Sequence, residues 1–260
     1  MCSHIPNSHS QSTQNASQSQ VFVYLDSKNR TSGSLSTSNF SYQFNWPKNK
    51  SYKYVSLISA QFQKGYYTID STNNTFTVVE TTGANTFTCS LTSGRNYTVS
   101  QFVAELKTQL DADNGSAQVY TVSYSSTTGF ITIANDTGEF TIDCDGNASM
   151  AQYLGINCNG TAVASSGQAI TSTRVVNMQR YSNLYIRSSI CRNGLNDILG
   201  CLDVKDTADF DMYQLTDLQY KWREAVNADS MMHNFSLTDI DGNGIDLNGC
   251  DIQLSFLLSQ

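Results

Sequence analysis

Short runs in which apolar and polar residues alternate recur along this chain, and they constrain its fold more than any other feature. Successive side chains of a β-strand point to opposite faces of a sheet, so such a run buries one face and exposes the other. The alternating runs lie at residues 40–44, 76–78, 87–89, 120–124, 131–133, 140–142, 235–237 and 252–258, with further strand-like runs at 21–25, 184–190 and 198–204. This pattern predicts a mainly β protein.

One run differs from the others because its apolar residues fall on both parities. Within residues 52–62, Val55, Leu57 and Ile58 do not alternate with polar residues. A strand with apolar residues on both faces is typical of the centre of a sheet that is covered on both sides. We therefore expect a central strand here.

The middle of the chain adds two helices to the strands. Thr98 and Gln101 form a capping box, which marks the start of a helix. Four apolar residues then follow at helical spacing: Phe102, Val103, Leu106 and Leu110. Asn114 and Gly115 predict the end of this helix, and a second, short helix is expected over residues 149–154 with Gly155 as its cap. The order strand, strand, helix, three strands, helix predicts a small α+β module over residues 66–159, with one amphipathic helix against a small sheet.

The remaining segments divide around this module. Residues 1–20 contain no charged side chain and little to bury, so they form either a floppy tail or an arm that orders only against neighbouring subunits. Residues 21–65 and 160–260 are expected to form the main β domain, and 158–182, rich in Gly, Ser, Thr and Ala, to act as a connector. Residues 211–225 fit either a strand pair or a helical turn.

Charge is scarce, which argues against several classes of partner. Charged residues make up 14% of the chain and the net charge is -7, whereas an average soluble domain is about a quarter charged. Nucleic-acid binding needs clustered basic residues, and Lys48, Lys50 and Lys53 are too small a cluster for it. We therefore expect no specific nucleic acid partner and no binding to an anionic membrane. No apolar run is long enough to span a membrane, and no apolar segment of a signal peptide follows the N-terminus.

Cysteine and histidine give no pattern of a metal or redox site. None of the seven cysteines forms a C-x-x-C pair, so we expect buried or half-buried reduced thiols that pack as small hydrophobes. Two of the three histidines, His4 and His9, lie in the first 20 residues. The third, His233, is expected to lie passively on a strand. No cofactor or metal is predicted.

A turn near the C-terminus resembles half of a calcium-binding loop. The segment 239–244 has the Asp, Asp and Asn spacing of the first half of an EF-hand loop, including Gly244 at position six. The second half does not fit, because Leu247 and Cys250 occupy positions nine and twelve and the flanking pattern is β. Asn and Gly are also favoured in tight hairpins, and a β-turn is the preferred interpretation.

Two further function classes can be weighed from single residues. A glycoside hydrolase would need a pair of carboxylates, and Asp111, Asp113, Asp206 and Asp209 are candidates that no motif marks as a pair. A carbohydrate-binding module would need exposed aromatic rings. Tyr66, Tyr67 and Tyr153 are candidates for stacking on a sugar. No catalytic motif is present, so we predict a protein that is not an enzyme.

Several motifs together resemble the penton and minor capsid proteins of the double-jelly-roll virus lineage, which includes virophages, Polinton-like viruses and large DNA viruses. The similar segments are YLDSKNR at 24–30, SG at 32–33, ST at 36–37, NFSY at 39–42, YVSLISA at 54–60, GYY at 65–67, FSLTDIDG at 235–242 and LNGCDI at 247–252. The middle block is similar to a module inserted in such proteins, with YTV at 97–99 opening its helix and LGI at 154–156 ending it.

The resemblance implies a single jelly-roll β-sandwich with an inserted small α+β module. It also implies a structural virion protein of the capsid, assembled in the host cytoplasm or nucleus. The favoured role is a penton subunit, in which five copies close each icosahedral vertex beside the major capsid protein and other minor capsid proteins. Another minor capsid (cement) protein and a fibre or receptor-binding module remain alternatives. Abundant tyrosine, 14 residues, fits a chain with large interfaces.

Overall fold

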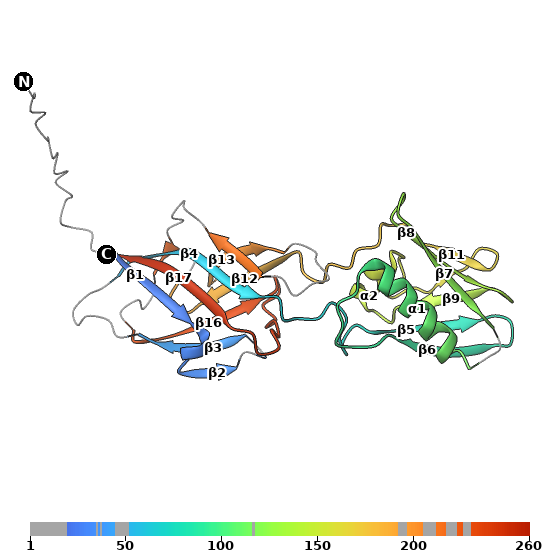
Figure 1. The fold of residues 1–260 in the computed structure, drawn as a ribbon, viewed down its shortest axis with the longest axis horizontal. Helices are drawn as coiled ribbons and strands as arrows, with labels where there is room; N and C mark the ends of the chain where they lie inside the picture. Colours follow the sequence, from blue (N-terminus) through green and yellow to red (C-terminus); the bar gives the residue numbers. More distant parts are fainter. Residues whose placement is uncertain are drawn as a thin grey trace, which may run out of the picture. The chain divides into compact units, whose positions relative to one another are not determined.

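The computed structural model describes residues 20–34, 36, 38–44, 52–115, 118–191, 197–204, 212–216, 223–225 and 230–260. The first 19 residues of the expected arm, Lys48 and Lys50, and Asp206 and Asp209 lie outside this part of the chain. The described residues form two compact units (Figure 1). The sandwich unit contains those of Met1–Gln63, Leu184–Leu202 and Met212–Gln260, and the middle unit those of Lys64–Asn183 and Asp203–Asp211.

Two antiparallel sheets build the sandwich unit. The first, called the front sheet, has the order β1 (Gln20–Asp26), β17 (Ile252–Ser259), β4 (Tyr54–Gln63) and β14 (Met212–Thr216), with the short β15 (Arg223–Glu224) also on β4. The second, called the back sheet, has the order β13 (Ile198–Asp203), β12 (Asn183–Ser188), β16 (Met232–Thr238), β3 (Asn39–Gln43) and β2 (Ser32–Ser34). The first and last strands of the chain are paired, as in a jelly roll. For residues 211–225 the sequence left a strand pair or a helical turn open. The described residues of this stretch form two short strands, β14 and β15, each paired with β4.

A bulge in β4 explains the mixed parity of its apolar residues. Ser59 lies opposite Ser255 and Leu57 opposite Phe256, so Ile58 is the extra residue of this strand. The bulge reverses the alternation, and four buried side chains therefore share one face: Val55, Leu57, Ala60 and Phe62. β4 is a central strand, as expected. The sequence suggested that both of its faces are covered, but most of its apolar residues lie on one face.

Aromatic side chains from both sheets meet in the core of the sandwich. Phe256 of the front sheet lies 5.9 Å, between ring centroids, from Phe235 of the back sheet, and Phe44 lies at the same distance from Phe256. Gly200 of β13 approaches Leu57 so closely that a β-carbon there would overlap a methyl group of the leucine. Burial of these side chains is the main stabilising term for a sandwich of this kind.

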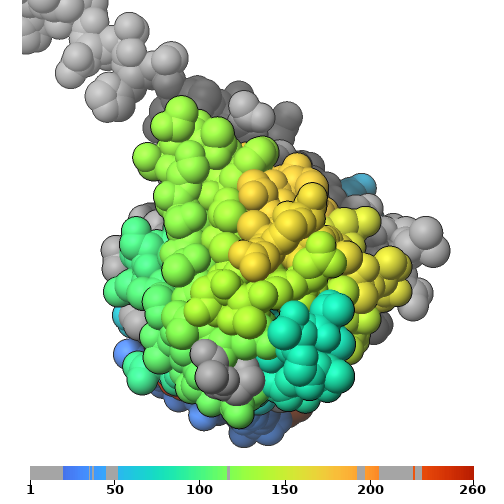
Figure 2. Space-filling view, turned by 90° about the vertical axis from the view of Figure 1, so that its right-hand side faces the viewer, coloured from blue at the N-terminus to red at the C-terminus, as the bar shows by residue number. Residues whose placement is uncertain are grey.

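The middle unit contains two small sheets where the sequence predicted one. One has the order β10 (Val163–Ala164), β9 (Phe140–Asp143), β5 (Thr75–Glu80) and β6 (Asn85–Ser90). The other has the order β11 (Ala169–Thr171), β8 (Phe130–Asn135) and β7 (Tyr120–Ser125). Figure 2 shows this unit, with the green β7–β8 hairpin beside the gold β11 segment to which β8 is paired. The 158–182 stretch is thus more than a connector, because β10 and β11 pair with both sheets.

The helices lie where the sequence predicted them. Helix α1 (Val99–Asp113) begins at the Thr98 and Gln101 capping box and contacts β6 and β7, which are edge strands of the two small sheets. Its buried residues are Phe102, Leu106 and Leu110. Helix α2 (Ala148–Leu154) ends at Gly155, whose φ of 67° is the left-handed conformation that glycine favours. Neither helix is long and apolar enough to cross a bilayer within the part of the chain that the structure describes.

A disulfide in the middle unit corrects the expectation of reduced thiols. Cys144 follows β9 and Cys158 follows α2, and their sulfurs are bonded with the Cα atoms 5.1 Å apart. The backbone N–H of Cys144 also donates to the carbonyl of Cys158 at 2.9 Å. Their 14-residue separation gave no motif, because the fold alone brings them together. In the described part of the chain, the reduced cysteines are Cys89, Cys191, Cys201 and Cys250.

Two further expectations for the sandwich unit are confirmed. His233 lies on β16, where it is buried against Phe44 with Nε2 3.0 Å from the carbonyl of Ser230. Residues 239–244 form a turn closed by Asn243, whose backbone and side-chain N–H groups donate to the two carboxylate oxygens of Asp239 at 2.8 and 2.9 Å. Gly242 has a φ of 90° in this turn.

Candidate interaction surface

The outward face of the front sheet is the strongest candidate for an interaction surface. Val23 and Leu25 of β1 point into the sandwich, so the alternate residues Phe22 and Tyr24 point out and are 54% and 76% exposed. Next to Tyr24, the outward residues of the neighbouring strands are uncharged polar groups, whereas Leu257, opposite Phe22, is apolar and buried. We call this face the front surface and define it by Phe22, Tyr24, Ser59, Gln61, Gln253 and Ser255.

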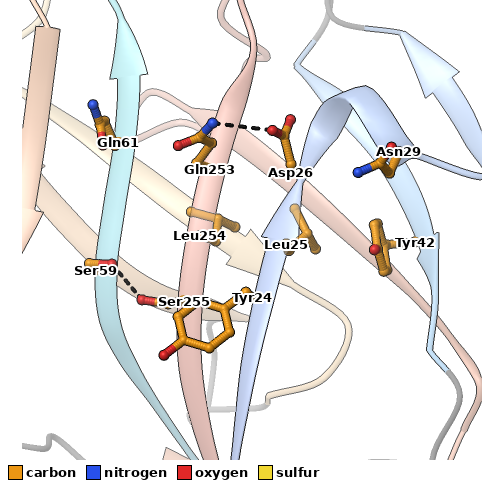
Figure 3. Close-up of a pocket in the computed structure, with 10 residues that line it drawn as sticks. All are labelled: Tyr24, Leu25, Asp26, Asn29, Tyr42, Ser59, Gln61, Gln253, Leu254 and Ser255. Carbon is orange, nitrogen blue, oxygen red and sulfur yellow. Dashed lines mark hydrogen bonds between the residues drawn. The ribbon is translucent and has the colours of Figure 1, made fainter.

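A shallow hollow of about 380 Å³ lies on the front surface. Figure 3 shows Gln61, Gln253 and Asp26 in a row across three strands, β4, β17 and β1, with Ser59, Ser255 and Tyr24 nearer the other end. Gln253 Nε2 donates to Asp26 Oδ2 at 3.1 Å, and the hydroxyls of Ser59 and Ser255 are hydrogen-bonded to each other. These bonds between neighbouring strands hold the polar groups in fixed positions.

The chemistry of the front surface favours contact over catalysis. Asp26 is the one charged side chain among the residues that line the hollow, and Lys28 and Gln253 already donate to its carboxylate. Protein interfaces are depleted in charge at their core and enriched in tyrosine and phenylalanine. The hollow has that composition, and none of its lining residues is a histidine or a cysteine.

The edge of the front sheet extends this surface. β1 pairs with β17 on one side, and no other described strand pairs with its second side. Natural edge strands are commonly shielded by lysine, proline or a bulge. The sequence of β1, QVFVYLD, contains neither residue, and its register with β17 is regular. This edge can therefore accept a further strand.

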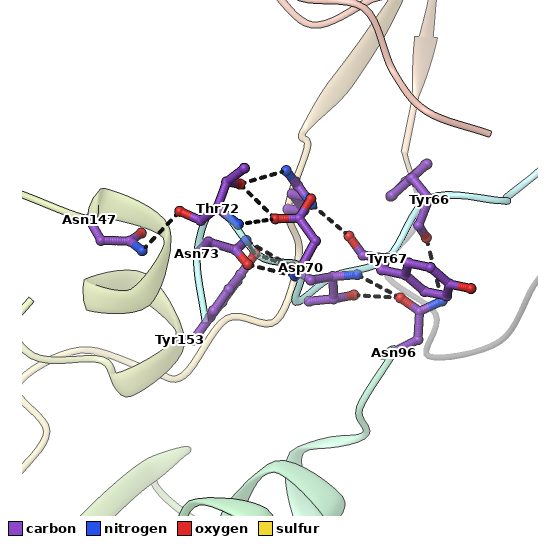
Figure 4. Close-up of polar contacts among 10 residues, drawn as sticks. Tyr66, Tyr67, Asp70, Thr72, Asn73, Asn96, Asn147 and Tyr153 are labelled. Atoms are coloured by element: carbon purple, nitrogen blue, oxygen red, sulfur yellow. Dashed lines mark hydrogen bonds and ion pairs between the residues drawn. The ribbon is translucent and has the colours of Figure 1, made fainter. Parts of the chain in front are cut away.

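A second group of polar contacts lies within the middle unit (Figure 4). Arg180 forms an ion pair with Asp70, and its Nη1 also donates to the carbonyl of Tyr67 at 2.9 Å. The hydroxyl of Tyr153 donates to the carbonyl of Thr68 at 2.9 Å. These contacts tie the first residues of this unit to Tyr153, 85 positions after Thr68, and to Arg180, more than 100 positions after Tyr67 and Asp70. Their role is structural.

The electrostatics of Asp70 follow from these contacts. Burial acts to raise its pKa, but hydrogen bonds from Thr72 and Arg180 together with the charge of Arg180 outweigh burial and lower the pKa below its usual value. The carboxylate is therefore ionised at neutral pH and paired within the fold.

Most of the sequence candidates that the structure describes take part in contacts within the fold or are buried. Asp111 accepts from Lys107 and from the backbone of Tyr120, and Asp113 accepts from the backbone of Ser90. Tyr66 and Tyr153 are 4% and 0% exposed, which contradicts their proposed role in stacking on a sugar, because neighbouring segments cover both rings. Within the described residues, no group of three or more His, Cys, Asp or Glu side chains is placed to hold a metal ion.

Sequence reasoning missed the front surface. The run 21–25 was interpreted only as a compact β-strand. The sequence signal for this surface is the pair Phe22 and Tyr24, which alternate with the core residues Val23 and Leu25 and so point to the opposite face of the strand. Large apolar residues on both parities of an edge strand, where no bulge intervenes, indicate an exposed apolar face.

Comparison with known proteins identifies the fold. No protein-family model matches the chain, and no curated protein matches its sequence. Among solved structures, the crystal structure of the selenomethionine-labelled mavirus penton protein is similar, with a TM-score of 0.52 and 10% sequence identity. The match covers 93% of this chain and 100% of the mavirus chain. The chain is therefore a jelly-roll β-sandwich with a small α+β module, and it shares this fold with the mavirus penton protein.

Proposed function

We propose that this protein is a structural virion protein, a penton subunit of which five copies close each vertex of an icosahedral capsid. The observation that carries the proposal is the fold shared with the mavirus penton protein over nearly the whole of both chains. The chain would work beside a major capsid protein and other minor capsid proteins in the virion. Assembly of a shell needs complementary surfaces and no catalytic group.

The front surface supports association of copies. A ring of identical subunits uses the same two patches at every contact, so each subunit must carry a surface that remains exposed until assembly. Phe22 and Tyr24 are such groups in the single chain. We propose that they become buried against a neighbouring copy, together with the uncharged polar groups around them.

The other parts of the chain have distinct roles in this proposal. The uncharged residues 1–20 would thread under a neighbouring subunit without the cost of removing charges from water. The module inserted between early strands would project from the shell or seal contacts with neighbours. Neither role needs a bound cofactor.

The test is the oligomeric state of the purified full-length chain. Mass photometry is expected to find a cyclic oligomer, and averaged electron micrographs are expected to show fivefold symmetry. Threefold symmetry would favour a fibre or a component of the hexameric shell. A chain that remains monomeric at high concentration and does not associate with virions would contradict the proposal.

A further inference from the structure

A second hollow, of about 490 Å³, lies along one side of α1 in the middle unit. The loop between β6 and this helix forms one wall, and residues of the first turns of the helix form the other. The backbone holds the loop in place, since the N–H groups of Gly94 and Arg95 both donate to the carbonyl of Ile69, at 2.9 and 3.1 Å. The hollow is thus built into the fold of this unit.

Arg95 brings an exposed cation to this hollow, and its charge acts on Glu105 and Tyr97. Arg30, Arg174, Arg180 and Arg187 each donate from the guanidinium to an oxygen of the protein. The side chain of Arg95 is exposed, and no described residue accepts a hydrogen bond from it. The guanidinium of arginine is a planar group with five N–H donors, so an exposed one at the rim of a hollow is suited to a ligand oxygen.

Glu105 places an acceptor opposite this donor. Its Oε1 accepts from the backbone and the hydroxyl of Thr92, at 3.1 and 2.6 Å, and from Gln109 Nε2 at 3.0 Å. These three bonds fix the carboxylate, while Oε2 accepts from none of the described residues. Burial acts to raise the pKa of Glu105, but the hydrogen bonds from Thr92 and Gln109 and the charge of Arg95 lower it overall. The acceptor is therefore ionised at neutral pH.

Two further side chains complete the lining. Gln101 uses Oε1 to accept from the backbone of Thr98 in the capping box, so its amide N–H groups are left for a ligand. Tyr97 is half-buried, and its hydroxyl donates to the carbonyl of Thr92 at 3.2 Å, which restrains the ring. An aromatic ring beside fixed donors and acceptors offers both an apolar contact and directional hydrogen bonds.

We propose that this hollow binds a neutral sugar of a glycan. A sugar hydroxyl both donates and accepts, which matches Arg95 and Gln101 as donors and Glu105 as acceptor, and its C–H face matches Tyr97. Arg95 and Glu105 are the charged residues that line the hollow, and their charges offset each other, so the hollow has no net charge that would favour an acidic sugar over a neutral one. Receptor binding by this site goes beyond capsid assembly and does not depend on it.

The test uses the full-length protein and defined sugars. Saturation-transfer NMR is run with the methyl glycosides of glucose, galactose, mannose and N-acetylglucosamine, and with N-acetylneuraminic acid as the acidic arm. At least one neutral glycoside is expected to bind. Arg95→Ala and Glu105→Gln are each expected to weaken that binding about tenfold or more, since each removes a charged hydrogen-bonding partner.

Lys107→Ala is the matched control, because Lys107 lies on the same helix but not in the hollow. It is expected to leave binding unchanged. Thermal melting and mass photometry of each variant check that fold and oligomeric state are preserved, which separates this result from the test of assembly. Binding of N-acetylneuraminic acid alone, no binding of any sugar, or binding that survives Arg95→Ala would overturn the proposal.

Discussion

At the scale of single residues, the contribution of Gly200 and Asp70 to stability depends on the side chain that each one meets in the fold. Gly200 is unremarkable in the sequence, one of 16 glycines, yet it lies where β13 passes against Leu57 of the facing sheet. Asp70 is one of many acidic residues, yet it pairs with an arginine 110 positions away. Neither role could be predicted from spacing, because both partners are distant in the chain.

Gly200→Ala is expected to destabilise the sandwich unit. The new β-carbon would overlap a methyl group of Leu57, a side chain that is 5% exposed and cannot swing into solvent. Overpacking of a core of this kind costs about 1–3 kcal/mol. Denaturant unfolding of the variant measures the loss, and the double variant Leu57→Ala/Gly200→Ala should remove the overlap. Equal stability of Gly200→Ala and the parent would contradict this account.

Asp70 is expected to make the middle unit less stable in acid. Its pKa is lowered in the folded state, so its ion pair with Arg180 stabilises the fold above the unfolded pKa, about 3.9, and is lost as pH falls through the folded value. Thermal melting between pH 7 and pH 3 should show Asp70→Asn below the parent at pH 7, with the difference shrinking towards pH 3. Asp241→Asn, on an exposed turn, is the control.

At the scale of elements, the sequence predicts the helices well, but it does not predict which strands pair. The capping box of Thr98 and Gln101 and the Gly155 cap predicted both helices, because these contacts join residues a few positions apart. The division of the middle unit into two sheets was missed, since alternation within a strand does not show which strands it pairs with. The strands β10 and β11 were missed because they are too short to show a period. The bulge at Ile58 was missed for a similar reason, because it is visible only against β17.

Loss of the disulfide is expected to destabilise the middle unit. A cross-link that closes a loop of about 15 residues contributes about 3 kcal/mol by restricting the unfolded chain, and Cys144 and Cys158 are 14 residues apart. The double variant Cys144→Ser/Cys158→Ser should melt at a lower temperature than the parent. Reducing agent should lower the melting temperature of the parent and of Cys250→Ser but leave the double variant unchanged. A parent that does not respond to reduction would count against the disulfide.

At the scale of the whole molecule, the arrangement of faces determines what the protein can assemble into. The front surface combines exposed aromatic side chains, polar groups that are already hydrogen-bonded, and an edge strand that can accept another strand. Charged residues make up 14% of the chain, and they are scarce on this surface too, because Asp26 is the one charged residue that lines the hollow.

Phe22→Glu and Tyr24→Glu are expected to abolish oligomers while leaving the single chain folded. Both side chains are exposed, so a charge there costs the monomer little, whereas burying it unpaired in an interface is strongly unfavourable. Mass photometry should shift to the mass of one chain, and circular dichroism should be unchanged. Val175→Glu, an equally exposed position in the middle unit, is the control. Oligomers that persist in both variants would remove the front surface from the assembly.

The sequence by itself determined the β class, both helices, the turn at 239–244 and the existence of a middle module, because each depends on contacts or periods within a few residues. Only the tertiary structure decided the disulfide, the bulge, the division into two small sheets and the hollow beside α1. The disulfide, the bulge and the two sheets need segments that are not neighbours in the sequence to meet, and such pairing leaves no period in the sequence. The hollow is lined by residues that are close in the sequence, but its loop is held in place by the carbonyl of Ile69. The same holds for the front surface: alternation shows that β1 has two faces, but only its place at the edge of the sheet leaves Phe22 and Tyr24 exposed.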